Sequence, residues 1–290
     1  MCLSPIYIKN SGPALKAGHS VPCGRCMDCL KRRAQGWAFR FQKEIEYNPF
    51  YIPLFITLTY SDDQLVYTGT YGLPTLYKPH IQLFMKRLRK HEKKLGNKLK
   101  LVYYCCGEYG PSTHRPHYHM LLLNCSRPAD LEALWGHGHV HIGKATDASV
   151  AYTLKYMQKP VVKRKDPLDD RVHEFALMSK KIGAAWLDDE ATAQDIQLRQ
   201  YLTGKRQDWI AVHNNVIALP RYIKEKLFTK RMRSYIARKH DKRAEEDLAR
   251  EKALYEAENQ HNTYEETKGY QINRKIYEYE QKLKGKRNKI

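Results

Sequence analysis

The chain has 290 residues, with 51 Lys and Arg against 31 Asp and Glu, a formal net charge of +20 and a mean hydropathy of −0.69. No apolar run approaches the ~20 residues that a membrane-spanning helix needs, and the first residues lack the basic-then-apolar layout of a secretory signal. We therefore expect a cytosolic protein that is long enough to bury a core and that contacts polyanions, either nucleic acid or an anionic membrane surface. A solvated lysine-rich surface is the alternative explanation of the charge.

The seven cysteines favour thiol chemistry in a reducing compartment over a disulfide framework, because their number is odd and three of them are clustered. Cys23, Cys26 and Cys29 follow one another at Cys-x2-Cys-x2-Cys spacing, which is typical of zinc ligands. Cys2 or His19 is the candidate fourth ligand of a closed structural zinc site. Free thiols on a helix or turn and an iron–sulfur cluster are the alternatives. The other cysteines lie in apolar, strand-like segments and are expected to be buried: Cys105, Cys106 and Cys125.

Composition divides the chain into three zones, which we take as its domains. Residues 1–36 are loop-rich, carry the cysteine cluster and end near a basic run. Residues 37–220 contain strand and helix signals, which are clearest before residue 160. Residues 221–290 are highly charged and helix-forming, which fits a long exposed basic helix with a frayed end better than a second globular core.

Strand and helix signals concentrate between residues 53 and 158. Pro53–Tyr60 is rich in β-branched and aromatic residues, which predicts a buried strand. Pro79–Lys94 has apolar residues at helical spacing with basic residues between them. From residue 160 to residue 220 we expect a mixture of short helices and loops. Further elements are expected in this order: strands over 99–107 and 118–123, a short helix over 131–134, a strand through 140–142, and a helix over 148–158.

The first chemical motif is RPHYHMLLL, residues 115–123. Successive side chains of a strand point to opposite faces, so His117 and His119 share one face about 7 Å apart, and Tyr118 points to the other. Two imidazoles so placed can share a divalent cation, and Glu108, at the end of the preceding strand, is the candidate third ligand. Such a set of nitrogen and oxygen donors suits Mn²⁺ and tolerates Mg²⁺. Ordinary strand histidines are the alternative when the motif stands alone.

The second chemical motif is AYTLKYMQK, residues 151–159. On a helix, Tyr152 and Tyr156 lie on one face about one turn apart, and Lys155 and Lys159 form a similar pair alongside. A phenol with a pKa near ~10 is about one part in a thousand ionised at pH 7, so a tyrosine nucleophile needs roughly 4 kcal/mol of help, part of which a nearby ammonium supplies. Amphipathic packing is the alternative explanation of this spacing.

Taken in order, FITLTY, GEYG with RPHYHMLLL, and YTLKYMQK resemble the motifs of the His-hydrophobic-His rolling-circle endonucleases. Within that superfamily the chain is most similar to the replication initiators of the microviruses, single-stranded-DNA phages of the gokushovirus type. The resemblance spans residues 1–225, because PCGRCMDCL, FALMS and LPRY match as well. It implies an α+β fold with a central antiparallel sheet flanked by helices. It also implies a divalent metal held by His117, His119 and a third polar ligand that varies among relatives.

The resemblance assigns the DNA-cutting step to the tyrosine motif. Tyr152 or Tyr156 would attack the origin phosphodiester and leave a 5′-phosphotyrosyl link and a free 3′-OH. The other tyrosine would cut the regenerated origin, and the released 3′-OH would close the first link into a circle. Lys155, or alternatively Lys159, would neutralise charge or protonate the leaving oxygen.

The implied partners are single-stranded DNA and supercoiled duplex origin DNA, with a host helicase and DNA polymerase, in the host bacterial cytoplasm and without a membrane role. Residues 221–290 hold 20 Lys and Arg against 12 Asp and Glu, a net +8, so +12 belongs to the rest of the chain and favours a basic groove there. Two other functions stay open: a non-catalytic, zinc-stabilised nucleic-acid-binding protein and a plasmid relaxase-like mobilisation protein. The candidate DNA contacts are Arg115, Lys31, Arg32 and Arg33.

Three further groups of residues have some features of a site. The tract His137–His141 holds three alternating histidines like a metal site, but it lies on an expected edge strand outside the three motifs. Thr57, Thr59 and Tyr60 in the first motif are expected to be structural or to contact DNA. His114 is either a phosphate contact or a solvated loop residue.

Overall fold

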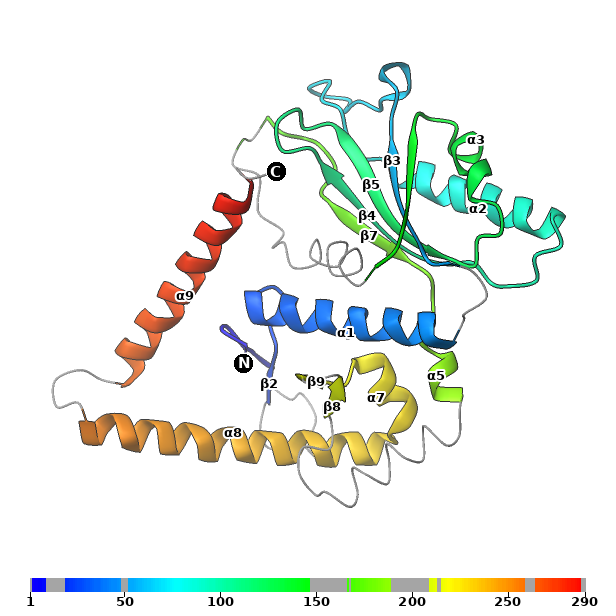
Figure 1. Cartoon of the computed structure of the whole chain (residues 1–290). Coiled ribbons are helices and arrows are strands. Elements are labelled where there is room, and N and C mark those ends of the chain that lie inside the picture. The colour runs from blue at the N-terminus through cyan, green and yellow to red at the C-terminus, as the bar shows by residue number, and fades with distance from the viewer. Residues whose placement is uncertain are drawn as a thin grey trace. The chain divides into compact units, whose positions relative to one another are not determined.

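The computed structural model of the chain describes residues 2–8, 19–47, 52–146, 166, 168–188, 209–212, 215–258 and 264–287. These residues form two compact units, one of residues 33–186 and one that combines residues 1–32 with residues 187–290 (Figure 1). The helix predicted over 148–158 lies outside the described residues.

The unit of residues 33–186 is built on an antiparallel sheet whose described strands follow the order β6-β3-β5-β4-β7. β5 lies at the centre, between β3 and β4, and each pair is antiparallel. The predicted α+β class is confirmed, as are the four strands expected from the sequence before residue 145. The bounds are β3 (Leu54–Thr59), β4 (Val102–Tyr109), β5 (Pro116–Leu123), β6 (Val140–Lys144) and β7 (Phe175–Met178).

Two predicted helices, α2 (Lys78–Lys94) and α3 (Leu131–Trp135), cover one face of the sheet (Figure 1). Apolar residues recur every three or four positions along α2, and they are buried together with the strand residues that point to this face. Trp135 is fully buried, and its indole N–H donates to the Thr59 carbonyl at 2.8 Å, which ties α3 to the end of β3. The buried apolar members of α2 are Ile81, Phe84, Met85 and Leu88.

The prediction of a loop-rich segment up to residue 36 is wrong, because α1 (Met27–Tyr47) begins within it. Phe41 of this helix is fully buried in a second apolar cluster, together with Tyr104 and Leu121 of the sheet. Helices therefore flank both faces of the sheet. The helical signal of α1 is present but is interrupted by cysteines and basic residues, and it consists of Leu30, Ala34, Phe41 and Ile45.

The segment from residue 166 to residue 220 contains strands where the sequence predicted short helices and loops. β7 extends the main sheet by pairing with β4, with Tyr104 opposite Met178. The other two strands form a separate hairpin. Each of the three has four residues, too few for a periodic pattern to stand out. The new elements are α5 (Ala185–Asp188), β8 (Trp209–Val212) and β9 (Asn215–Ala218).

The predicted helical extension over 221–290 is confirmed, but its described residues form separate helices. After the first of these helices, Phe228 takes an extended conformation and is buried. The Met232 N–H then donates to the Thr229 hydroxyl at 3.2 Å, which caps the next helix. None of the described helices is both long and apolar enough to cross a membrane. The helices are α7 (Arg221–Leu227), α8 (Lys230–Glu258) and α9 (Tyr264–Arg287).

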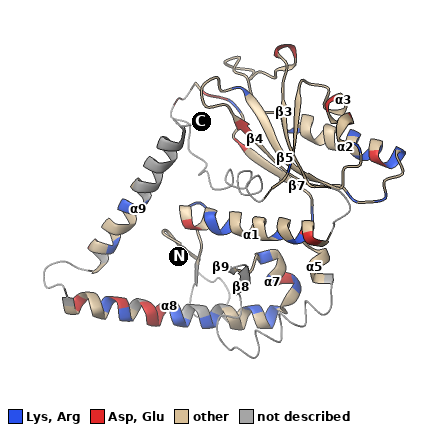
Figure 2. Cartoon of the chain, viewed as in Figure 1, with Lys and Arg blue, Asp and Glu red and all other residues tan. Residues whose placement is uncertain are grey.

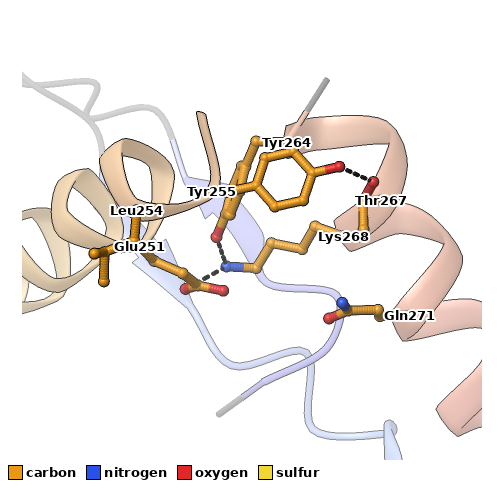
Figure 3. Close-up of a pocket in the computed structure, with 7 residues that line it drawn as sticks. All are labelled: Glu251, Leu254, Tyr255, Tyr264, Thr267, Lys268 and Gln271. Carbon is orange, nitrogen blue, oxygen red and sulfur yellow. Dashed lines mark hydrogen bonds and ion pairs between the residues drawn. The ribbon is translucent and has the colours of Figure 1, made fainter. Parts of the chain in front are cut away.

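Polar contacts join α8 to α9. Lys268 Nζ lies 3.0 Å from Glu251 Oε2 and also donates to the Tyr264 hydroxyl, while Tyr255 bonds to Thr267 alongside (Figure 3). Charges of both signs run along α8 (Figure 2). Because exposed ion pairs contribute about 0–1 kcal/mol each, these contacts orient the helix ends more than they stabilise the unit.

Candidate metal centre

The register of β4 and β5 brings the predicted metal ligands together. Glu108 lies directly opposite His117, and Cys106 lies opposite His119. Glu108 Oε2 is 3.8 Å from His117 Nε2 and 3.9 Å from His119 Nε2. Glu108 and His119 are only 9% and 8% exposed. Tyr118, between the histidines, points to the opposite face and is fully buried under α2, as the alternation of the strand predicts.

Neighbouring groups hold both imidazole rings at their Nδ1 atoms. The Thr57 hydroxyl, which faces His119 across the β3–β5 pair, is 3.0 Å from His119 Nδ1. The Phe55 ring stacks on the same imidazole with 5.6 Å between the ring centroids. His117 Nδ1 lies 3.2 Å from the Arg115 carbonyl, to which it can donate. Each ring is thereby directed with Nε2 toward Glu108, the orientation that a metal-binding histidine requires.

This donor set fits the cation that the resemblance implies. The separations between Nε2 and the carboxylate are longer than hydrogen bonds, and all three ligand atoms lie within 4.8 Å of one another. Two imidazole nitrogens and one carboxylate oxygen suit Mn²⁺, or Mg²⁺ when phosphate oxygens complete the shell. The residues present can therefore hold one divalent ion on the face of the sheet opposite α2.

On the α2 face, directly behind the histidines, a buried hydroxyl network braces β5. The Tyr60 hydroxyl is 3.0 Å from the Tyr118 hydroxyl and 2.9 Å from His80 Nδ1. The Tyr77 N–H donates to the Tyr118 hydroxyl at 2.8 Å. Burial raises the pKa of Tyr60 to about 12, and it raises the pKa of Tyr118 well above its usual value as well. Both phenols therefore stay protonated near neutral pH, and the structural role expected for Tyr60 fits this environment.

The histidine tract His137–His141 has structural partners in place of a shared metal. The His137 ring stacks on His80 with 3.9 Å between ring centroids, and His139 Nδ1 is 2.7 Å from Glu132 Oε2. Within the described chain, no group of metal-ligating atoms includes these histidines. β6, which carries His141, is an edge strand of the described sheet, as predicted. The Thr59 hydroxyl donates to the His139 carbonyl at 3.0 Å, so this threonine also has a structural contact.

The predicted DNA contacts lie in two places. Arg115 is tied to the end of β3, because its guanidinium lies 2.5 Å from Asp62 Oδ1 and donates to the Tyr60 carbonyl at 2.6 Å. The basic residues 31–33 are exposed on α1. His114 is exposed in the turn before β5, with a positive φ of 52°. The structure gives Arg115 a bracing role, and contact of these side chains with DNA stays a prediction.

The four predicted catalytic residues, Tyr152, Lys155, Tyr156 and Lys159, lie outside the described residues. The predicted cysteine cluster, by contrast, is described, and Cys2, Cys23, Cys26 and Cys29 come together. The cysteines expected to be buried are at most 4% exposed: Cys105, Cys106 and Cys125.

The sequence motifs did not identify Phe55 and Thr57 as the residues that orient His119. The alternation of β3 places both on one face, which is a signal available in the sequence. Their position beside His119 depends on the pairing of β3 with β5, strands separated by more than fifty residues of chain. That pairing becomes visible only in the folded sheet.

The fold and this strand-borne cluster define a class of protein with an antiparallel sheet that carries a His-x-His metal site. Residues 53–161 match the sequence model of a family described as replication-associated protein ORF2. The matched segment contains β3, β4, β5 and β6, with all three candidate metal ligands.

Individual relatives agree with this family match. The chain is similar to the replication-associated protein ORF2 of Spiroplasma virus 4, at 33% identity over 57% of this chain and 56% of the relative. It is similar to the replication-associated protein VP4 of Bdellovibrio phage phiMH2K, at 31% identity over 59% of each chain. It is also similar to the replication-associated protein ORF4 of Chlamydia phage 1, at 29% identity over 71% of this chain and 53% of the relative. The predicted resemblance to phage replication proteins is confirmed, although the chain spans little more than half the length of these relatives. No solved structure matches the chain significantly.

Proposed function

We propose that the chain is a rolling-circle replication initiator that nicks one DNA strand at a phage origin by tyrosine attack. The observation that carries the proposal is the cluster of Glu108, His117 and His119, which lies within the segment that matches the replication-associated family. Mn²⁺ or Mg²⁺, when bound there, would polarise the scissile phosphate and stabilise the charge that develops on it in the transition state. The chain's own residues hold the two imidazoles in place for that role.

In the proposed reaction, Tyr152 or Tyr156 forms a bond from its phenol oxygen to phosphorus as the bond from phosphorus to O3′ breaks. The phenol loses its proton, and Lys155, or alternatively Lys159, delivers a proton to the departing 3′ oxygen. The products are a 5′-phosphotyrosyl link and a 3′-OH that primes synthesis. With two tyrosines, one keeps the 5′ end while the other cuts the regenerated origin, and the released 3′-OH closes the circle.

The charge distribution is consistent with this substrate. Outside residues 221–290 the chain carries a net +12, and a single DNA strand must lie along the face that holds Glu108, His117 and His119 for its phosphate to reach them. The proposal places the protein in the host bacterial cytoplasm, where single-stranded and supercoiled origin DNA, a host helicase and a host polymerase are its partners.

The test is covalent trapping. The full chain is incubated with Mn²⁺ and a tiled set of single-stranded oligonucleotides that covers both strands of the phage genome. We expect one region to give a protein–DNA adduct whose digestion leaves a phosphotyrosine at Tyr152 or Tyr156, and we expect the adduct to disappear only when both tyrosines are Phe. Absence of an adduct with every oligonucleotide, or its persistence in the double variant, would refute the proposal.

The histidine cluster has its own control. His117→Ala should abolish cleavage while salt-sensitive DNA binding largely persists, and His114→Ala, in the exposed turn before β5, should leave cleavage intact. Equal loss of binding and cleavage in His117→Ala would indicate a folding defect.

A non-catalytic, zinc-stabilised nucleic-acid-binding protein is the second candidate function, and the assembled cysteine cluster favours it. It predicts salt-sensitive DNA binding without any adduct in the trapping experiment. A relaxase-like mobilisation protein would form the same tyrosyl adduct, but with a plasmid transfer origin in place of phage DNA.

A further inference from the structure

Four cysteines meet where the N-terminal hairpin joins α1. β1 (Ile6–Ile8) pairs with β2 (His19–Val21), with Ile6 opposite Val21, so the chain just before β1 lies beside the chain just after β2. This pairing brings Cys2 next to the Cys-x2-Cys-x2-Cys block, whose last member lies in the first turn of α1. The four Sγ atoms all lie within 4.8 Å of one another.

The spacing of the sulfurs fits a single tetrahedral ion. With Zn–S bonds of about 2.3 Å, a tetrahedron of sulfurs has edges of about 3.8 Å. Cys26 Sγ and Cys2 Sγ are 3.8 Å apart, and all four cysteines are free of disulfides. An iron–sulfur cluster distributes its cysteines over several metal atoms, so sulfurs this close together fit one mononuclear ion better.

Backbone N–H groups point at the sulfurs, as they do around metal-bound thiolates. The Cys23 N–H donates to Cys2 Sγ at 3.3 Å, and the Cys26 N–H donates to Cys23 Sγ at 3.3 Å. The Leu3 N–H donates to Cys26 Sγ at 3.4 Å. Gly24 takes a positive φ of 75°, a conformation that glycine adopts easily and that shapes the turn between two of the ligands. These donors stabilise negative sulfur, which a bound cation requires.

The surrounding chain lacks a core that would hold it in place. None of the side chains described before α1 is buried, and Ile6, Tyr7 and Ile8 of β1 are 44%, 59% and 44% exposed. A segment with so little buried apolar surface needs another source of order, which metal binding provides directly.

We propose that Cys2, Cys23, Cys26 and Cys29 bind one Zn²⁺ as a closed structural site. Four protein ligands fill the tetrahedral shell, so no position is left for a substrate or water and the ion does not take part in DNA cleavage. The zinc joins the N-terminal hairpin to the first turn of α1, directly before Lys31 and Arg32. The proposal is independent of the nicking function, because it concerns different residues and is measured by different means.

The first test counts zinc in the full chain, purified without chelators. We expect one zinc per chain that resists dialysis, lost in Cys26→Ser and kept in Cys125→Ala, a cysteine outside the cluster. His119→Ala should also keep it, which separates this ion from any at Glu108, His117 and His119. Zinc retained by Cys26→Ser, or iron in its place, would overturn the proposal.

The second test uses the unmodified sequence, so it remains decisive when a cysteine variant fails to fold. Protein grown with Co²⁺ should show the visible bands of a tetrahedral ion and near-ultraviolet thiolate charge transfer, both abolished by added Zn²⁺. Four thiols should become reactive to alkylation only after chelation, and mass spectrometry should locate them at the four cluster cysteines. Four fast-reacting thiols in the untreated protein, with no cobalt bands, would show that the cysteines are free.

Discussion

At the scale of single residues, Thr57 links the sheet to the candidate metal site. Its hydroxyl is 3.0 Å from His119 Nδ1, and its place opposite His119 follows from the β3–β5 register. A partner at Nδ1 fixes the tautomer and orientation of a ligating imidazole, so Thr57 acts through His119 and is a positioning residue.

Thr57→Val removes this partner with little change in side-chain shape. We expect Mn²⁺ affinity to fall by about 10–100-fold, because partners behind metal ligands typically contribute that much. Nicking should then need more Mn²⁺ and recover when the ion is saturating, which a Mn²⁺ titration of adduct formation and direct Mn²⁺ binding both measure. Thr59→Val, whose lost hydroxyl bonds to the His139 carbonyl, should keep the wild-type Mn²⁺ dependence. If the two variants shift the titration equally, Thr57 has no special role.

His80 makes the stability of the sheet unit sensitive to acid. Its pKa is lowered to about 4, first by burial and then by His137 and Arg87, against about 6.5 for an unperturbed histidine. Between these values the unfolded chain binds more protons than the folded chain, so the free energy of unfolding must fall as the pH drops through this range. The ring also faces Tyr77 and accepts a hydrogen bond from Tyr60, so the folded state favours its neutral form.

His80→Asn keeps an acceptor near Tyr60 but cannot be protonated. Urea unfolding at pH 7, 5.5 and 4.5 should show a smaller loss of stability on acidification for this variant than for the wild type. His114→Asn, in the exposed turn, should retain the wild-type pH dependence. An unchanged slope in His80→Asn would mean that other groups dominate the acid response.

At the scale of elements, the chain between α3 and β6 wraps tightly around the end of β3. The Ser61 N–H donates to the His137 carbonyl at 2.9 Å, and the Thr59 N–H donates to the His139 carbonyl at 3.0 Å. Gly138 between them has a φ of 143°, and a Cβ there would lie 2.5 Å from Ser61 N. The alternation of glycine and histidine that resembles a metal tract thus reflects close backbone packing.

Gly138→Ala should be strongly destabilising, because the added methyl meets backbone atoms that cannot move independently. We expect a loss of about 2 kcal/mol or more in the free energy of unfolding, measured as a lower urea midpoint. Gly69→Ala is the matched control: nothing lies within 4 Å of its added Cβ, so its stability should stay within about 0.5 kcal/mol of the wild type. Similar midpoints for the two variants would contradict the packing argument.

The elements that the sequence predicted are those whose pattern is strong and local. β3 and α2 have clear periodicity, and the pairing of His117 with Glu108 follows from one short hairpin. α1 was missed because charged and cysteine residues interrupt its apolar stripe, and β7 because four residues carry almost no period. Contacts between distant strands, such as Thr57 beside His119, depend on tertiary pairing that no local pattern encodes.

At the scale of the whole molecule, the net charge of +20 is divided between the helical extension and the rest of the chain. If DNA lies along the sheet unit and α1, the exposed residues Lys31 and Arg32 neutralise phosphates and release counterions. The salt dependence of binding reports the number of such contacts, whatever the DNA sequence.

Replacing both residues, as Lys31→Gln with Arg32→Gln, tests this assignment. For single-stranded DNA each phosphate contact contributes about 0.7 to the slope of log K against log salt, so two lost contacts should reduce the slope by about 1.4. Fluorescence anisotropy with a labelled oligonucleotide at several salt concentrations measures it. The double variant Tyr152→Phe with Tyr156→Phe should keep the wild-type slope, because it removes the proposed chemistry without removing charge. An unchanged slope in the Lys31 and Arg32 variant would move the DNA contact elsewhere, and α8, whose first half is basic, would be the next surface to test.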